Sequence, residues 1–329
     1  MKVTIKDVAR EANVATSTVS RVISNSSRIS EETKKKVNEV IKRLNYKPNE
    51  LARKLVSNKS RILGVIIPKE ASSFFSNHFF VEAMIGMSMV ADEEKYYLMY
   101  VFCKTEEDEL KNVKEFLVNN LLDGLCILTV RENDRCIDYL KRSKFPFVVI
   151  GNPDNNRGIL FVDNDNIKAT YKITNKFIKD GYKKIGFIGG NKNFKVSKDR
   201  LKGYLDALKQ NNISINKNII VEAENFTESL GFKAMEKILK KETPNIVITA
   251  EDLLAVGANK YLNEKGIKDI KIIGFNNTPI TQYQNPPISS IDINSRQLGY
   301  EAAKLLINFL NGIPLKEKHK MVKTKFIER

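Results

Sequence analysis

A chain of 329 residues is too long for one ordinary hydrophobic core and fits a small module joined to one large or two medium domains. Its 42% apolar content excludes a disordered chain. The net charge of +16 favours a polyanionic partner, either nucleic acid or an acidic membrane surface. Half of this excess lies in the first 60 residues, where 14 Lys and Arg stand against 6 Asp and Glu, a net of +8.

Cysteine usage and hydropathy predict where the protein works. Cys103, Cys126 and Cys136 are scattered without metal-ligand spacing, and this sparse, odd number is typical of a reducing cytosol. The start MKVTIKDVAR lacks the apolar core of a signal peptide, and no run approaches the roughly 18 apolar residues needed to span a bilayer. We therefore expect a cytoplasmic protein with no membrane contact, no metal and no cofactor.

Residues 1–48 predict three short helices that form a domain of their own. Thr4 and Asp7 have the spacing of a capping box, which would begin the first helix. After a turn, a second helix is expected from Thr16 to about Ser24.

A third helix is expected after Ser30, whose hydroxyl suits a helix cap. The residues at positions i, i+3, i+4 and i+7 of this helix form one apolar stripe, namely Val37, Val40, Ile41 and Leu44. Pro48 ends the domain, and residues 49–60 form a hinge and linker. Their segment NELARKL has helical character, but seven residues are too few for a stable isolated helix. We expect this segment to fold only against a partner surface.

From Arg61 the sequence changes to short apolar runs that alternate with amphipathic stretches. This alternation predicts parallel βαβ units. The chain could pass between two such sheets near residues 161–163 and 289–293. The apolar runs are RILGVII, YLMYVF, GLCILTV, FPFVVI, KKIGFIGG, NIVITA and KIIGF.

Enzymatic functions find little support in the sequence. It contains only two histidines, His78 and His319, and no P-loop, G-x-G-x-x-G, H-E-x-x-H or G-x-S-x-G motif. The glycines of IGFIGGNKN lack the spacing of a phosphate-binding loop. We therefore expect a protein that is not an enzyme.

The segment TIKDVAREANVATSTVSRVISNSSRISEETKKKVNEVIKRLNYKPNELARKL resembles, nearly end to end, the headpiece of the lactose-repressor/galactose-repressor (LacI/GalR) family. The helix lengths, the turn, the YxP motif and the LAR-x-L hinge all occur in order. The remaining sequence resembles the family's periplasmic-binding-protein-like core. The resemblance implies an α + α/β protein, with a lambda-repressor-like helix-turn-helix headpiece and a two-lobed α/β core over residues 61–329. The implied lobes are an N-lobe of about 61–161 and 293–320, and a C-lobe of about 162–292 and 321–329.

A helix-turn-helix places its second helix in the major groove of DNA. Val19, Val22 and Ile23 would face the headpiece core, which leaves the polar side chains of that helix for the groove. An arginine there can bind guanine with two hydrogen bonds, worth about 1–3 kcal/mol of discrimination. Ala15 stands where many members carry a capping Ser, so Thr16 is an alternative cap. The expected DNA contacts are Thr4, Thr16, Ser17, Thr18, Ser20, Arg21, Asn25, Ala52, Arg53 and Leu55.

The resemblance assigns Leu55 to the leucine that wedges between central base pairs from the minor groove, with Ala52 beside it. Such a wedge kinks the duplex and widens the contact. The short hinge helix then needs both DNA and a dimer mate to form, which makes it a natural switch. The alternative for Leu51 and Leu55 is packing against their own domain.

Sugars are held by aromatic faces and by planar polar groups in a cleft between lobes. The resemblance assigns Arg200 to contacts with ligand hydroxyls or carboxylates, and Phe226 to stacking on the ligand. Glu251, Asp252 and Asn276 follow apolar strands, where open α/β sheets bind ligands. Many members carry Asn-Asp or Asp-Asp at positions 251 and 252, and an acid at position 276. Glu251 and Asn276 depart from this pattern. The expected effector contacts are Phe74, Phe75, Phe79, Asp163, Arg200, Phe226, Glu251, Asp252 and Asn276.

The run SSFFSNHFF at residues 72–80 is expected to be a loop leading into a helix, and its aromatic rings would suit a disaccharide or a longer glucan. Ordinary core packing is the alternative for each single ring. Together with FPFVVIGNPD and FVDNDN, this loop resembles the branch of the family that regulates maltose and maltodextrin use.

The family resemblance implies a nucleoid-associated repressor that binds palindromic operator DNA as a homodimer, since one headpiece reads one half-site. A maltose-type sugar would bind between the lobes and release the DNA as an inducer. The alternatives are another sugar, a purine co-repressor, a phosphocarrier co-repressor, and a solute-binding protein without DNA function.

Overall fold

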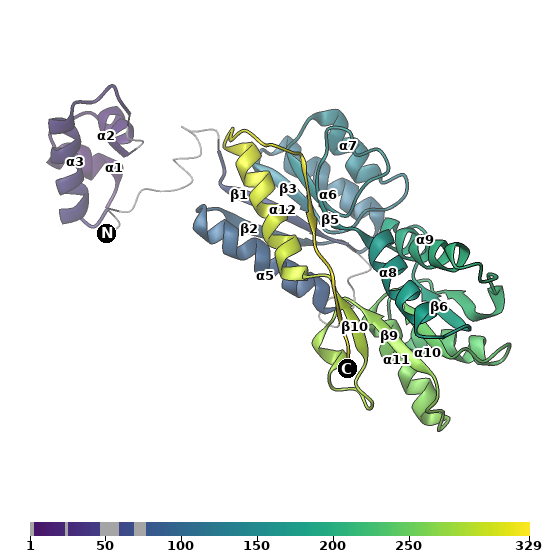
Figure 1. Ribbon diagram of the computed structural model, residues 1–329. Helices are drawn as coiled ribbons and strands as arrows, with labels where there is room; N and C mark the ends of the chain where they lie inside the picture. Colours follow the sequence, from purple (N-terminus) through teal and green to yellow (C-terminus); the bar gives the residue numbers. More distant parts are fainter. Residues whose placement is uncertain (1–2, 24–25, 47–58, 69–76) are drawn as a thin grey trace. The chain divides into compact units, whose positions relative to one another are not determined.

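The computed structural model describes residues 3–23, 26–46, 59–68 and 77–329. The chain divides into two compact units, residues 1–60 and 61–329 (Figure 1). Among the described residues, no helix has the length and apolarity that a membrane span requires.

The described part of the first unit contains three helices, α1 (Ile5–Glu11), α2 (Thr16–Ile23) and α3 (Glu31–Arg43). The predicted capping box begins α1, because Asp7 accepts hydrogen bonds from both the backbone N–H (2.9 Å) and the hydroxyl (2.7 Å) of Thr4. Ser30 caps α3 by accepting the Thr33 N–H. The helices bury a small core of aliphatic side chains, which includes Val8, Ala12, Val19, Val22, Val37 and Val40.

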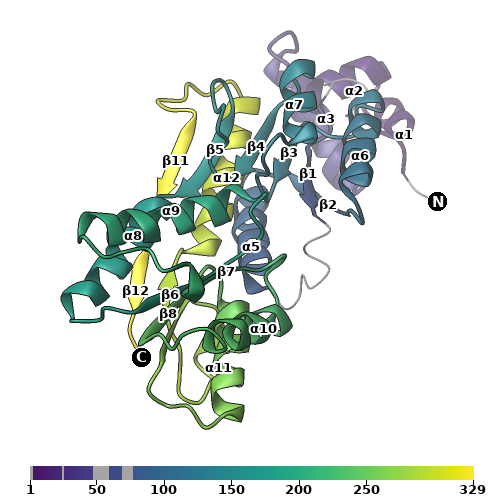
Figure 2. The ribbon, with the colours of Figure 1, turned by 90° about the vertical axis from the view of Figure 1, so that its right-hand side faces the viewer.

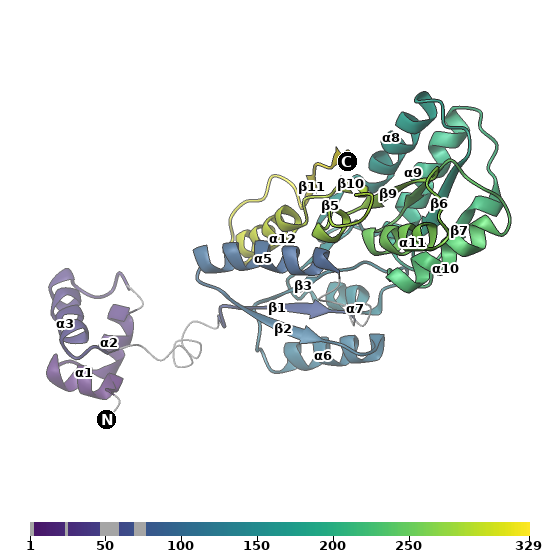
Figure 3. The same cartoon turned by 90° about the horizontal axis from the view of Figure 1, so that it is seen from below.

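In the second unit, one parallel sheet has the strand order β11-β5-β4-β3-β1-β2. Helices α5 (His78–Glu93) and α12 (Ser295–Leu310) cover one face, and α6 (Glu106–Val118) and α7 (Arg135–Ser143) cover the other (Figure 3). The strands are β1 (Ile62–Ile67), β2 (Tyr97–Phe102), β3 (Gly124–Ile127), β4 (Phe147–Ile150), β5 (Leu160–Asn164) and β11 (His319–Val322).

Strand β1 shows why the sheet needs helices on both faces. Leu63, Val65 and Ile67 pack with the residues of α5 and α12, whereas Ile66 packs with those of α6 and α7. A strand that is buried on both faces reads as a continuous apolar run, as RILGVII does.

The second sheet has the order β12-β10-β9-β8-β6-β7, in which only β12 is antiparallel to its neighbour. Helices α8 (Asn166–Lys179) and α9 (Lys195–Gln210) cover one face, and α10 (Glu228–Leu239) and α11 (Asp252–Glu264) cover the other. The strands are β6 (Ile185–Gly189), β7 (Ile220–Glu222), β8 (Ile246–Thr249), β9 (Lys271–Phe275), β10 (Ser289–Asp292) and β12 (Lys325–Ile327), with short 3-10 helices at Lys217–Ile219 and Pro279–Thr281.

Helices α5 and α12 approach each other at two glycines. A Cβ atom on Gly86 would lie 1.9 Å from the carbonyl oxygen of Arg296, and one on Gly299 would lie 1.8 Å from that of Ala83. Both distances are far below van der Waals contact, so the helix pair requires glycine at these positions.

The chain passes between the two sheets three times. The passages follow Asn164 at the end of β5, Ile293 after β10, and Val322 at the end of β11. Figure 2 shows β11 in the first sheet and β12 in the second. The strand pairing thus ends the first N-lobe segment at Asn164, three residues beyond the sequence-based boundary at 161, because the whole of FVDN pairs or packs with the first sheet. The last boundary likewise moves from 320 to Val322.

Candidate functional site

The second helix of the small unit presents polar side chains on one face and apolar side chains on the other. Val19 and Val22 are buried in the headpiece core, whereas Thr16, Ser17 and Arg21 are exposed. The N–H groups of Thr18 and Val19 both donate to the Ala15 carbonyl. Ala15 therefore occupies the capping position before α2, and its side chain has no hydrogen-bond acceptor. Thr18 and Ser20 are half-buried, and Thr4 is exposed at the start of α1.

Several residues expected at the two sites lie outside the described residues. They are Asn25, Ala52, Arg53 and Leu55 of the expected DNA contacts, and Phe74 and Phe75 of the expected effector contacts. Their assignments stay predictions.

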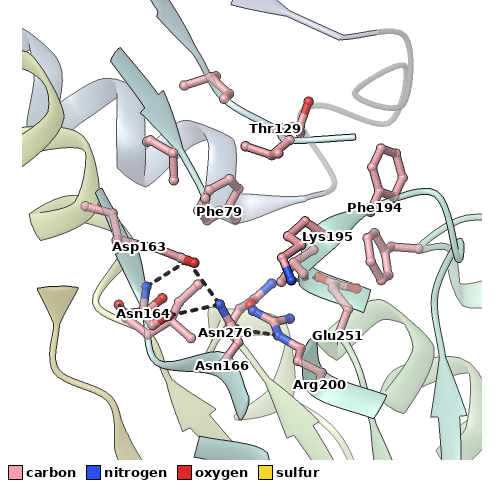
Figure 4. A pocket seen from close by; sticks show the side chains of 18 of the residues that line it. Phe79, Thr129, Asp163, Asn164, Asn166, Phe194, Lys195, Arg200, Glu251 and Asn276 are labelled. Atoms are coloured by element: carbon pink, nitrogen blue, oxygen red, sulfur yellow. Dashed lines mark hydrogen bonds between the residues drawn. The ribbon is translucent and has the colours of Figure 1, made fainter. Parts of the chain in front are cut away.

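A cleft with about 860 Å³ of empty space lies between the two sheets of the larger unit. Both lobes line it: Phe79 and Thr129 come from the first lobe, and Phe194, Arg200 and Glu251 come from the second (Figure 4). Six of the residues expected to bind an effector meet at this cleft, namely Phe79, Asp163, Arg200, Phe226, Glu251 and Asn276.

Arg200 forms the polar floor of the cleft and is 4% exposed. Its Nε donates to Oδ1 of Asn166 (2.9 Å) and its Nη1 donates to the carbonyl of Ala250 (2.5 Å). The guanidinium carbon lies 3.7 Å from the centre of the Phe275 ring. These contacts hold the guanidinium plane in one orientation. Burial lowers the pKa of Arg200 to about 10, which leaves it charged at neutral pH.

Two buried carboxyl groups flank Arg200. Burial raises the pKa of Glu251 to about 8 and that of Asp163 to about 7. Glu251 accepts the N–H of Leu253 and so caps α11, and its second oxygen accepts from the Asn276 amide. At neutral pH, Glu251 is therefore largely protonated, and the polar floor offers a mixture of donors and acceptors.

Aromatic rings form the walls of the cleft. Phe194 and Phe226 lie nearly parallel at 6.1 Å, and Phe79 comes from the start of α5 on the opposite lobe. Asn77 caps α5 by accepting the Phe79 N–H (3.1 Å), which fixes where this ring enters the cleft. A Cβ atom on Gly190 would lie 2.1 Å from the Phe226 ring, so this glycine makes room for an aromatic wall.

Asn276 directly follows β9, and its backbone has a φ of 107°. Its Nδ2 donates to Glu251, while its buried Oδ1 has no hydrogen-bond partner among the described residues. A buried polar atom without a partner is costly, unless a ligand or water completes it. Asn276 lines the cleft, so a ligand bound there can supply such a donor.

Asp252 lies away from the cleft, in contrast to its expected place beside Glu251. One of its oxygens accepts the N–H (2.6 Å) and the hydroxyl (2.8 Å) of Thr278, and the other accepts the hydroxyl of Ser290 (2.7 Å). Glu251 is the cap of α11 and Asp252 is its first helical residue, so the two neighbours have different backbone conformations and their side chains turn to different partners. Asp252 therefore fastens the loop after β9 to β10.

Three of the lining residues that sequence reasoning does not single out make contacts at the cleft. Asn166 joins Asp163 to Arg200, Phe194 stacks on Phe226, and Lys195 pairs with Asp199 (2.7 Å) and Asp154 (3.2 Å). The FVDNDN motif is a signal for Asn166, since its amide follows Asp163 by three positions. The stack of Phe194 on Phe226 joins two loops of the second lobe, and the pair of Lys195 with Asp154 forms only when the lobes meet.

Matches to known proteins cover both units. Residues 4–49 match the family of bacterial regulatory proteins, lacI family, and residues 174–329 match the periplasmic binding protein-like domain. The HTH-type transcriptional regulator MalR of Streptococcus pneumoniae (strain TIGR4) is 37% identical over 94% of this chain and 94% of its own. Catabolite control protein A of Staphylococcus aureus (strain MRSA252) is 33% identical over 96% and 95%.

Solved structures share the same fold. A putative transcriptional regulator LacI from Bacillus cereus subsp. cytotoxis is 35% identical, with a TM-score of 0.79 over 82% of this chain and 98% of that chain. The lac repressor dimer bound to operator and the anti-inducer ONPF is 23% identical, with a TM-score of 0.83 over 100% and 98%, and this likeness concerns the fold alone.

A helix-turn-helix unit followed by a two-lobed core with a polar and aromatic cleft defines a DNA-binding transcriptional regulator that responds to a small molecule. The chain belongs to the lacI family of bacterial regulatory proteins. The predicted family and fold class are thereby confirmed.

Proposed function

We propose that the protein is a cytoplasmic, nucleoid-associated repressor whose inducer is a maltose or maltodextrin-type sugar. As a homodimer it binds inverted-repeat operator DNA, and the sugar binds in the cleft between the lobes. The observation that carries this proposal is the composition of the cleft, which combines aromatic walls with a fixed, planar polar floor.

The charge balance of the cleft favours an uncharged ligand. The Arg200 guanidinium lies near the carboxyl groups of Glu251, Asp163, Asp252 and Asp199, of which Glu251 is largely neutral at pH 7. A carboxylate or phosphate ligand would bring negative charge next to the carboxyl groups that remain ionised. A sugar brings hydroxyl groups, which can accept from Arg200 and donate to the free Oδ1 of Asn276.

The aromatic walls of the cleft favour a glucose oligomer. Rings on both sides can pack against the C–H faces of pyranose units. The 37% identity to the MalR regulator supports the maltose class in particular.

For the DNA contact, we propose that the exposed face of α2 enters the major groove. Arg21 would read a guanine with its guanidinium, while Thr16 and Ser17 would contact neighbouring bases or phosphates. Two copies of the headpiece, related by a two-fold axis, then match an inverted repeat.

Thermal-shift screening of the full chain tests the effector. Maltose, maltotriose, trehalose, sucrose, ribose and purine bases are compared, and a ligand at 100 times its Kd should add about 2.7 kcal/mol to the stability. We expect a shift with maltose or maltotriose only. A shift with another sugar or with a purine, and none with maltodextrins, would contradict the maltose class.

Selection from a random inverted-repeat duplex library tests the DNA function, with and without the sugar that gave the shift. We expect one enriched half-site and loss of binding when the sugar is added. Equal binding to all duplexes would contradict sequence-specific repression, and tighter binding with the sugar would make it a co-repressor.

A further inference from the structure

One buried amide connects all three passages between the lobes. The Nδ2 group of Asn164 donates one hydrogen bond to the carbonyl of Ile293 (3.0 Å) and another to the carbonyl of Val322 (2.9 Å). Asn164 itself ends β5, where the first passage begins. Ile293 opens the second passage, and Val322 opens the third. The three residues are far apart in sequence, yet a single side chain holds them together.

The amide has little exposure to solvent, because Asn164 is 3% exposed, Ile293 is 2% exposed and Val322 is 8% exposed. Asn164 and Ile293 also belong to the lining of the cleft. A buried carbonyl that loses its donor is costly to leave unpaired. Asn164 therefore ties the first passage to each of the other two by a bond that is costly to break.

The lobes also touch on another side of the cleft. The Glu132 N–H donates to the Asn193 carbonyl (2.9 Å), and the Lys195 N–H donates to the Val130 carbonyl (3.1 Å). Residues 130–132 belong to the first lobe and residues 193–195 to the second, so this contact is a bridge between separate lobes. Opening the cleft requires these bonds to break, while the three passages stay connected through the chain.

We propose that Asn164 is the pin of the hinge between the lobes. By fastening the three passages to one another, its amide makes them turn together, so the lobes open and close about one axis and do not slide or twist past each other. Asn164 also lines the cleft, but its role as the pin is to restrict the motion that any ligand can drive. The proposed role of Asn164 belongs to the hinge of the ligand-free protein. It does not depend on which small molecule the cleft binds.

The position of Asn164 in sequence joins this pin to the cleft. Its neighbour Asp163 accepts from the Asn166 amide (3.0 Å), and Asn166 in turn accepts from Arg200 (2.9 Å). Two side chains, those of Asn166 and Asp163, thus connect Arg200 to the pin. A displacement of Arg200 would move Asn166 and Asp163, and through them Asn164, which joins the three passages.

Distance distributions between two spin labels test the proposal on the full chain without ligand. The labels are attached at Val118→Cys on α6 of the first lobe and at Lys237→Cys on α10 of the second, both at exposed positions. The native cysteines are buried, so the two introduced thiols react first. Labelled protein is diluted with unlabelled protein, so that distances between copies of the chain are not measured.

Asn164→Ala and Asn164→Asp are compared with the parent and with Asn175→Ala. Asn175 is a matched control, because it lies on α8 and accepts an amide hydrogen bond from Asn211, the residue that follows α9 (2.9 Å), within one lobe. We expect both Asn164 variants to widen the distance distribution at least twofold, and the Asn175 variant to keep the parental width. Asn164→Gln, which keeps both donors on a longer side chain, should give an intermediate width.

Parental widths in the Asn164 variants, or an equal widening in the Asn175 variant, would overturn the proposal. Failure of all three Asn164 variants to fold would also overturn it, because Asn164 would then be a requirement of the first lobe itself. Since no sugar or DNA is present, these results are independent of whether the protein binds maltodextrins.

Discussion

Two opposing effects act on the charge of the Glu251 carboxyl group. Its carboxyl group caps α11, where the positive end of the helix dipole favours a negative charge, yet the group is 2% exposed and burial disfavours that charge. Burial is the stronger effect and raises the pKa to about 8. Burial likewise raises the pKa of Asp163, to about 7, although Asp163 caps no helix and accepts from the Asn164 N–H and the Asn166 amide.

The raised pKa of Glu251 predicts that the core loses stability as the pH rises from about 4.5 to 8. In this range the unfolded chain releases the proton at its ordinary value of 4.5, while the folded protein still holds it. Folding then takes up a proton, and the free energy of unfolding falls by up to about 1.4 kcal/mol per pH unit. Glu251→Gln keeps the capping oxygen and should flatten this slope, as measured by urea unfolding of the core between pH 5 and 8.

Glu236→Gln is the control for this measurement, since Glu236 lies at the surface of α10 in an ion pair with Lys240. It should leave the pH slope of the parent unchanged. If Glu251→Gln shows the parental slope above pH 7, where Asp163 contributes little further, the buried carboxyl does not hold its proton.

Helix boundaries were predictable wherever a local side chain decides them. Thr4 with Asp7, and Ser30 with Thr33, form the expected caps because each partner lies three residues away. The packing at Phe194 could not be predicted, because the stacked partner Phe226 comes from another βα loop. Asp252 was expected in the cleft for its place after a strand, but only the tertiary contacts with Thr278 and Ser290 show which way it turns.

At the scale of helices, the contact between α5 and α12 depends on Gly86. In Gly86→Ala the added methyl group would meet the Arg296 carbonyl at 1.9 Å, so the two helices must move apart. We expect a loss of about 1–3 kcal/mol in the free energy of unfolding, measured by urea denaturation. Ser88→Ala, at an exposed position of the same helix, should stay within about 0.5 kcal/mol of the parent. A Gly86 variant as stable as the parent would contradict the close approach.

The exposed face of α2 predicts a loss of base discrimination in Arg21→Ala. If Arg21 reads a guanine, binding to the selected operator should weaken by about 1–3 kcal/mol, and the preference at one position of each half-site should disappear. Fluorescence anisotropy with operator and with random duplex separates the two effects. Lys42→Ala removes one charge from the exposed surface of α3 and should leave the base preference unchanged. If Arg21→Ala weakens binding to the operator and to random DNA equally, Arg21 contacts a phosphate and does not read a base.

For the whole core, ion pairs between the lobes support the backbone bridge at the cleft. Lys198 of α9 pairs with Glu132 of the first lobe, and Lys195 pairs with Asp154. The charges are partly exposed, so each pair stabilises the closed arrangement by about 0.2–1 kcal/mol and is weakened by salt.

Reversing one charge should therefore favour the open arrangement of the lobes. Glu132→Lys places two positive charges together at Lys198, and we expect a larger radius of gyration by small-angle X-ray scattering at low salt. The double variant Glu132→Lys/Lys198→Glu restores the opposite charges and should return the radius to the parental value. An unchanged radius in the single variant, or no recovery in the double, would show that this pair does not influence closure.

The strand order of the two sheets has a consequence for biosynthesis. The first lobe is completed by α12 and by β11 at its edge, which emerge from the ribosome only after every α/β unit of the second lobe. Domains generally fold during translation as soon as their sequence is available. Here the synthesis of the first lobe begins before that of the second lobe and ends after β10. The apolar surface that α12 covers therefore stays exposed on the nascent chain while the second lobe is synthesised.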